Sequence, residues 1–212
     1  LLLYTGVRKT DDGDEFQTQC IAVGDGNNYQ KSPLNPVIDD SMLPAGGSHV
    51  DFRDPKIWRD EEGHHAAVAN LCTEENGMIL LYDSEDARHW RYIGVLAAGH
   101  GHYGTMWEGP DFFLLDGKGV VLHSAHEMLN DGLEFHPGDG IVCHIGRHDR
   151  EEHRLLDKQV QAGDYVIITF GHNDEKPKAD RHTDPGSTFD YNLAKFVRET
   201  SEHGGIPVLM NC

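Results

Sequence analysis

Short apolar or alternating runs, separated by Gly, Asp and Asn, dominate the chain from residue 1 to about residue 153. Turn signals such as Gly24-Asp-Gly26, Glu75-Asn-Gly77 and Asp116-Gly117 lie between these runs. Apolar residues do not recur at helical spacing over more than two turns here, so the pattern predicts an antiparallel all-β fold: a sandwich, barrel or propeller. The expected strands are Leu1–Thr5, Gln17–Val23, His65–Leu71, Met78–Ser84, Trp90–Leu96, Phe112–Leu115, Gly119–Ser124 and Ile141–Gly146.

The pattern changes after about residue 155. Tyr165–Phe170 is a solid apolar run that predicts a buried strand, and Ile206–Met210 predicts a second one. Between them, Phe189, Leu193, Phe196 and Val197 follow the spacing of an amphipathic helix, with Ser187 or Thr188 as its cap and Gly204-Gly205 at its end. Strand, helix and strand in this order predict a parallel βαβ unit. We therefore expect two domains, 1–154 and 155–212.

Composition and charge narrow the possible partners. Eighteen Lys and Arg against 36 Asp and Glu give a formal net charge of −18, which would repel a nucleic acid or an anionic bilayer. The apolar runs are far shorter than the ~20 residues that a membrane span needs. Neutral partners such as sugars fit this charge better. The four cysteines form no zinc motif and no dense disulfide framework, which favours buried free thiols. A cytoplasmic location is only slightly favoured over a secreted one.

Two short motifs carry candidate chemistry. Phe52-Arg-Asp-Pro55 places a guanidinium beside a carboxylate, and Pro55 favours an extended conformation at Asp54. In Trp107-Glu-Gly-Pro-Asp111, Glu108 lies between an aromatic ring and a Gly-Pro turn, where desolvation would raise its pKa and suit it to proton donation. Taken alone, the first motif is more often a structural corner or surface ion pair, and the second a solvated glutamate before a turn.

Taken together and in order, these stretches resemble glycoside hydrolase family 32, the β-fructofuranosidases such as invertase, inulinase, levanase and sucrose-6-phosphate hydrolase. The resemblance covers about residues 1–154 and implies a mainly β fold, here part of a five-bladed β-propeller. It implies that Asp54 holds sugar hydroxyls and stabilises the transition state, that Arg53 lies beside it, and that Glu108 is the general acid/base. The matching stretches are Tyr4-Thr-Gly6, Gln17-Thr-Gln-Cys-Ile-Ala22, Asn35-Pro-Val-Ile38, Asp51-Phe-Arg-Asp-Pro-Lys-Ile-Trp58, Leu80-Leu-Tyr-Asp-Ser84, Met106-Trp-Glu-Gly-Pro-Asp-Phe-Phe113 and Asp131-Gly-Leu-Glu-Phe135.

The resemblance is incomplete in two places. Retaining glycoside hydrolysis needs a nucleophilic carboxylate as well as an acid/base. The family carries its nucleophile in an Asn-Asp-Pro-Asn-Gly stretch, which this sequence does not contain, and Gly109 stands where most members have Cys. Because the chain begins with Leu1 and lacks this block, we expect a fragment that is inactive by itself.

The last 55 residues or so are similar to SGNH (GDSL-like) hydrolases, especially rhamnogalacturonan acetylesterases. The resemblance implies a small flavodoxin-like α/β fragment in which Gly171-His-Asn-Asp174 supplies Gly171 and Asn173 to an oxyanion hole. On local grounds the same stretch is more often a turn closed by Asn and Asp side chains. The serine and Asp-x-x-His blocks of that family do not occur here.

We therefore interpret the sequence as a truncated, chimeric chain whose inherited function is hydrolysis of β-fructofuranosidic bonds in sucrose, sucrose phosphate or fructans. The alternatives are deacetylation of a plant polysaccharide by the second part, or no catalytic function. The 15 histidines match no zinc spacing, and no metal or other cofactor is expected. The expected partner is a small sugar or a fructan, with no nucleic acid and no membrane.

Overall fold

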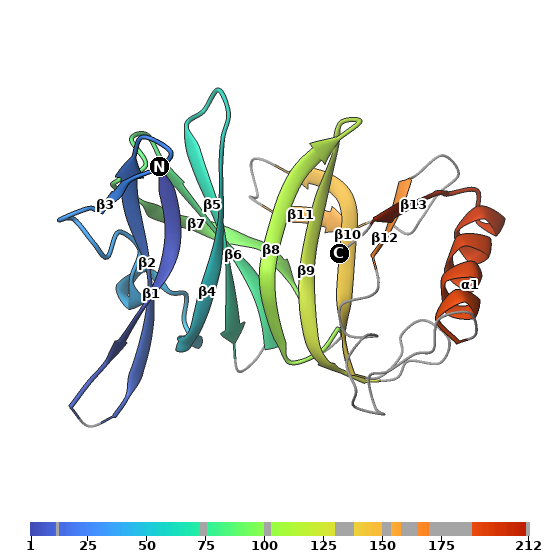
Figure 1. Ribbon diagram of the computed structural model, residues 1–212, viewed down its shortest axis with the longest axis horizontal. Helices are drawn as coiled ribbons and strands as arrows, with labels where there is room; N and C mark the ends of the chain where they lie inside the picture. Colours follow the sequence, from blue (N-terminus) through green and yellow to red (C-terminus); the bar gives the residue numbers. More distant parts are fainter. Residues whose placement is uncertain are drawn as a thin grey trace. The chain divides into compact units, whose positions relative to one another are not determined.

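The computed structural model describes residues 1–11, 13–72, 76–99, 103–129, 138–149, 154–157, 165–169 and 188–210 (Figure 1). Contacts divide the chain into two compact units, Leu1–Leu156 and Asp157–Cys212. The strands are β1 Leu2–Lys9, β2 Glu15–Gly24, β3 Tyr29–Lys31, β4 Gly47–Arg59, β5 His64–Cys72, β6 Asn76–Ser84, β7 Arg91–Ala98, β8 Met106–Leu115, β9 Lys118–Met128, β10 Gly138–Asp149, β11 Arg154–Asp157, β12 Tyr165–Thr169 and β13 Ile206–Met210. The helices are a short 3-10 turn, Asp40–Met42, and α1, Thr188–Glu202.

Three sheets build the first unit, and they follow one another along the chain. Their strand orders are β1-β2-β3, β4-β5-β6-β7 and β11-β10-β9-β8. Neighbouring strands that follow each other in sequence pair antiparallel, as β5 does with β6 in an unbroken register from His64–Ser84 to Cys72–Asn76. In Figure 1 the β4–β7 sheet lies between the other two. The mainly β class expected from the sequence is confirmed, and the sheets in the described residues do not close on themselves.

The β4–β7 sheet is buried on both faces. On β5, Ala66 and Val68 pack into a core shared with Ile21 and Ile38 of the β1–β3 region, whereas Ala67 and Ala69 point the other way. That second face packs against a core that includes Trp107, Phe112 and Val121 of β8 and β9. Because alternate residues of a strand point to opposite faces, a strand covered on both sides needs apolar residues at consecutive positions. This explains why β5 and β6 are continuous apolar runs and not alternating ones.

The second unit contains the expected strand, helix and strand. β12 and β13 pair in parallel, from Tyr165 opposite Ile206 to Thr169 opposite Met210, and α1 lies between them in the sequence. α1 ends just before Gly204-Gly205, as the sequence predicts. Gly204 has φ +76°, and its N–H donates to the carbonyl of Ser201, which closes the last turn. The parallel βαβ arrangement is confirmed. Helices in the described residues are too short or too polar to span a membrane.

The sequence analysis missed β4, which carries the Arg-Asp-Pro motif. The sequence pattern favours a corner at this motif, because charged residues and Pro55 interrupt the alternation of apolar and polar residues that indicates a strand. The structure places the motif inside a 13-residue strand, at a register shift between Arg53 and Lys56. Asp54 has φ +59°, so the extended conformation expected there is wrong. A β-bulge explains both results, since it leaves a residue unpaired and so accommodates a proline that has no N–H to donate.

Candidate active site

Glu108 also sits at a bulge, on the first half of β8. The register of β8 with β9 shifts between Glu108 and Asp111, where the sequence analysis expected a corner ahead of a shorter strand. Gly109 has φ +54°, a left-handed conformation that glycine adopts without steric cost. Two bulges on two different sheets therefore present the Asp54 and Glu108 motifs.

The two bulges are joined by direct hydrogen bonds. The N–H of Gly109 donates to Oδ2 of Asp54 at 3.0 Å. Arg53 donates from Nε and Nη2 to the same oxygen of Glu108, Oε1, at 3.0 and 2.8 Å. Its Nη1 donates to Oδ1 of Asp51 at 2.9 Å. Asp54 and Glu108, 54 positions apart in sequence, thus lie in one polar cluster with the guanidinium of Arg53. Their chemical roles stay predictions.

A layer of polar side chains from β1 and β2 supports the Asp54 bulge. The backbone N–H of Asp54, which the bulge frees from the sheet, donates to Oγ1 of Thr5 at 2.9 Å, and this hydroxyl donates to Oε1 of Gln19 at 3.1 Å. Gln19 is fully buried and donates from Nε2 to the carbonyl of Phe52 at 2.8 Å. Gln17 accepts from the N–H of Phe52 at 2.9 Å and from Arg53 at 3.2 Å. Sequence reasoning assigned no role to these residues, although two glutamines two positions apart on one strand share a face.

His126 on β9 completes the surroundings of Glu108. Its Nε2 lies 2.8 Å from Oε2 of Glu108, the carboxylate oxygen that Arg53 does not bind. The sequence analysis considered the histidines only as metal ligands or solvated residues and did not single out this one. The signal that could have found it is its position on the strand that follows Glu108 in a hairpin.

The pKa of Glu108 is lowered, which corrects the expectation of a raised value. Desolvation does raise it, but hydrogen bonds and charges from His126 and Arg53 together outweigh desolvation and hold the pKa below its ordinary 4.5. The Trp107 ring, the expected apolar neighbour, does not lie on the face of β8 that carries the Glu108 carboxylate. Trp107 precedes Glu108 in the strand, so its ring points to the opposite face and is fully buried there.

The sequence profile described as "Glycosyl hydrolases family 32 N-terminal domain" matches residues 1–182. The chain belongs to this family. The sucrose-6-phosphate hydrolases of Bacillus subtilis (strain 168) and Klebsiella pneumoniae are each 31% identical to it, over 159 and 155 residues. These alignments cover 73% and 71% of this chain but 32% of each relative, so the family 32 chain spans about a third of the length of the curated relatives it matches.

Solved structures with a similar fold cover about three quarters of this chain. The Bombyx mori GH32 beta-fructofuranosidase superposes with a TM-score of 0.65 at 32% identity, covering 76% of this chain and 35% of that chain. The sucrose-6-phosphate hydrolase from Lactobacillus gasseri has a TM-score of 0.63 at 23% identity, which shows the fold alone. These matches give no support to the SGNH resemblance. The family 32 profile continues to residue 182, past the boundary expected at 154, and Gly171 and Asn173 lie outside the described residues.

Behind the carboxylate cluster, the family 32 domain buries a pair of histidines. His123 and His144 are 1% and 5% exposed, and their Nε2 atoms lie 2.9 Å apart. His123 also stacks on Trp107 with ring centroids 3.7 Å apart. One imidazole must donate and the other accept, so the two rings cannot both be protonated. Burial, and then the neighbouring His144, hold the pKa of His123 well below its ordinary 6.5.

We expect the unfolding free energy to fall in mild acid because of this pair. Below pH 6.5 the unfolded chain binds a proton at His123 that the folded protein excludes, so the stabilisation is complete above 6.5 and is lost as the pH falls toward the lower folded-state pKa. The loss is at most about 1.4 kcal/mol per pH unit for one proton. Urea unfolding of wild type and His123→Gln across this range measures it. The variant should show a flatter pH dependence, and equal slopes in the two proteins would contradict the assignment.

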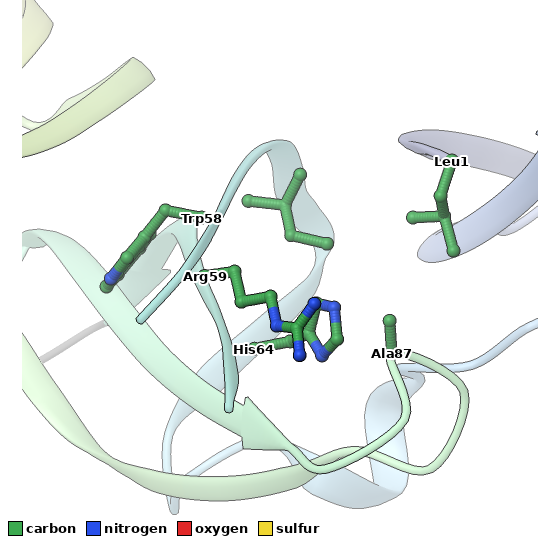
Figure 2. A pocket seen from close by; sticks show the side chains of 6 residues that line it. Leu1, Trp58, Arg59, His64 and Ala87 are labelled. Atoms are coloured by element: carbon green, nitrogen blue, oxygen red, sulfur yellow. The ribbon is translucent and has the colours of Figure 1, made fainter. Parts of the chain in front are cut away.

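Two other features of this family 32 domain lie apart from the cluster. A hollow of about 240 Å³ is lined by Leu1, Ile57, Trp58, Arg59, His64 and Ala87, none of which belongs to the carboxylate site (Figure 2). Asp60, Glu62 and His65 each place a possible metal-ligand atom within 4.8 Å of the others. His65 Nε2 lies 2.9 Å from Oδ1 of Asp60, so a direct hydrogen bond explains why these two side chains are close, without a bound ion.

Proposed function

We propose that this chain supplies the acid/base and the hydroxyl-binding carboxylate of a site that hydrolyses β-fructofuranosidic bonds, as in sucrose, sucrose phosphate or fructans. The observation that carries the proposal is the cluster of Arg53, Asp54 and Glu108 across β4 and β8. The family membership and the relatives named sucrose-6-phosphate hydrolase and beta-fructofuranosidase support the substrate class.

In the proposed reaction, Glu108 protonates the glycosidic oxygen as the carbon–oxygen bond to the fructosyl group breaks. A carboxylate nucleophile attacks the opposite face of the anomeric carbon and forms a fructosyl-enzyme ester. Glu108, now ionised, removes a proton from water, which hydrolyses the ester with net retention. Asp54 accepts hydrogen bonds from sugar hydroxyls throughout, and these bonds stabilise a transition state that carries positive charge on the ring. The residues of this chain account for every role except the nucleophile.

The sheet arrangement supports placing these roles in a propeller. We propose that the β1–β3, β4–β7 and β8–β11 sheets correspond to successive blades of a five-bladed propeller. β4 and β8 are each the first strand of their sheet along the chain, and the cluster joins these two strands. First strands of successive blades line the central axis of such a fold, which would give the sugar an axial site. A net charge of −18 is compatible with a neutral sugar and disfavours polyanionic partners.

Sugar binding at Asp54 tests the proposal without requiring turnover. Fructose or sucrose added to ¹⁵N-labelled chain should shift the amide signals of Asp54, Glu108 and Gly109 in a saturable manner. Asp54→Asn should weaken this binding by about tenfold or more, because a charged acceptor of hydroxyl hydrogen bonds is lost. Asp83→Asn, which removes a partly buried carboxylate paired with the exposed Arg91, is the matched control and should bind as wild type. Unchanged affinity in Asp54→Asn would refute the assigned role.

The acetylesterase alternative has one observation in its favour. β12 and β13 form a parallel pair, as a flavodoxin-like sheet requires, with α1 between them in sequence. We infer deacetylation only as a second candidate, because the described residues of the second unit include neither Gly171 nor Asn173. Release of acetate from an acetylated pectin fragment, lost in Asn173→Ala, would support it.

A further inference from the structure

His126 lies between two carboxylates that come from the strands on either side of it. Its Nε2 is 2.8 Å from Oε2 of Glu108 on β8, and its Nδ1 is 3.4 Å from Oδ1 of Asp139 on β10. The imidazole is about one-third exposed, whereas the Asp139 side chain is 12% exposed. Both ring nitrogens therefore face an acceptor, one at the candidate acid/base and one away from it.

The sheet fixes this geometry. β9 lies between β8 and β10 in the sheet. His126 pairs with Met106 of β8, and Met106 lies two positions before Glu108, on the same face of that strand. On the other side, the register of β10 with β9 shifts between Gly138 and Gly140, where two residues of β9, His126 and Glu127, lie opposite Asp139 alone and form a bulge. The backbone N–H of Glu127, a residue with φ +58°, donates to Oδ1 of Asp139 at 3.2 Å. Asp139 is thus held in place by the strand that carries His126.

The protonation chemistry follows from the two acceptors. A neutral imidazole has one N–H, whereas the protonated ring has two and can donate to Glu108 and Asp139 together. Charged groups near the pair in the described part of the chain include Arg53, which binds the other oxygen of Glu108, Asp51, which binds Arg53, and Asp54, which accepts from the N–H of Gly109. Glu108 is thereby surrounded by donors that favour its ionised form, yet a general acid must carry a proton when the glycosidic bond breaks.

We propose that His126, oriented by Asp139, is a positioning residue that sets the protonation state of Glu108. The proposal rests on the proposed function, in which Glu108 is the acid/base. When the proton moves from Nε2 of His126 to Oε2 of Glu108, the N–H bond breaks and the O–H bond forms. This leaves a neutral acid beside a neutral imidazole that keeps its proton on Nδ1, 3.4 Å from Oδ1 of Asp139. The reverse transfer returns to His126 the proton that Glu108 later takes from water.

A purely structural role for His126 makes a different prediction. Glutamine at position 126 can donate a hydrogen bond to Glu108 but carries neither a charge nor a titratable proton. A hydrogen bond alone would therefore survive His126→Gln, and the titration of Glu108 would stay as in the wild type. If the charge and proton of His126 matter, the Glu108 titration must change.

The experiment is a pH titration of the Glu108 carboxyl carbon by ¹³C NMR, in wild type and three variants, with Glu108→Gln assigning the signal. We expect His126→Gln to move the midpoint upward toward the ordinary 4.5, since the charge that lowers it is lost. Asp139→Asn, which leaves the ring in place without its orienting carboxylate, should change the midpoint less. His89→Gln removes an exposed histidine paired with Asp86 and should leave it unchanged.

A midpoint in His126→Gln equal to that of the wild type overturns the proposal. If His126→Gln does not fold, as judged by the near-ultraviolet circular dichroism of the buried tryptophans, Asp139→Asn carries the test, and an unchanged midpoint there overturns the proposal equally. No sugar is present in the titration. Failure of sugar binding at Asp54 would therefore overturn the proposed function, whereas failure of the Glu108 shift would overturn only the role of His126.

Discussion

Sucrose hydrolysis by the purified 212-residue chain is expected to equal that of its Glu108→Gln variant, at the background of the assay. The chain carries the proposed acid/base, Glu108, and the proposed hydroxyl-binding carboxylate, Asp54, but no Asn-Asp-Pro-Asn-Gly stretch, in which the family resemblance places the nucleophile. Catalytic groups that act as a unit are strongly non-additive, so loss of one of them lowers the rate by about 10⁴-fold or more. Without the nucleophile no fructosyl-enzyme ester forms, so Glu108 has no ester whose hydrolysis it could assist.

The Glu108→Gln variant serves as the control because contaminating host invertases are efficient enzymes. It replaces the acid with an amide of the same shape and leaves the rest of the chain unaltered. Released glucose or fructose is measured over long incubations at several pH values. Turnover by the wild-type chain that clearly exceeds turnover by the variant would contradict the prediction, and would mean that another carboxylate in this chain acts as the nucleophile.

The strands that could be predicted from the sequence are those with a simple pattern. β1 and β2 each contain a short apolar run, and β5 and β6 are continuous apolar runs because both of their faces are buried. β4 could not be predicted in the same way, because its bulge at Asp54 and Pro55 interrupts the alternation with a charged residue and a proline. The feature that hides this strand from pattern analysis also frees the backbone N–H that Thr5 binds.

The residues of the candidate site likewise differ in whether the sequence alone could identify them. Arg53, Asp54 and Glu108 stand in local motifs, so a family resemblance was enough to find them. Thr5, Gln17, Gln19, His126 and Asp139 act through contacts between strands, and which residues meet there depends on register shifts that the sequence does not display. The pKa of Glu108 was predicted in the wrong direction for this reason, since its controlling neighbours lie 55 residues before it and 18 after it.

Gly77→Ala is expected to destabilise the first unit by about 1–3 kcal/mol, the usual cost of an added methyl group in a packed core. Gly77 lies in β6, and a Cβ atom there would come within 2.4 Å of Cδ1 of Trp107. The indole cannot move away easily, because His123 stacks on it and its Nε1 donates to the carbonyl of Tyr103 at 2.9 Å. The neighbouring strand must therefore shift.

A double-mutant cycle separates this clash from the small intrinsic effect of replacing glycine in a strand. Trp107→Ala removes the ring atoms that the new methyl group would meet, Cγ, Cδ1 and Nε1, so Gly77→Ala should cost much less in that background. The coupling free energy between the two substitutions is the quantity to measure, by urea unfolding followed in the far-ultraviolet circular dichroism. Additive effects would show that the methyl group is accommodated elsewhere. Because Trp107 directly precedes Glu108, a strained Gly77→Ala protein should also show altered amide signals at Glu108 and Gly109, which would link the packing between the sheets to the geometry of the candidate acid.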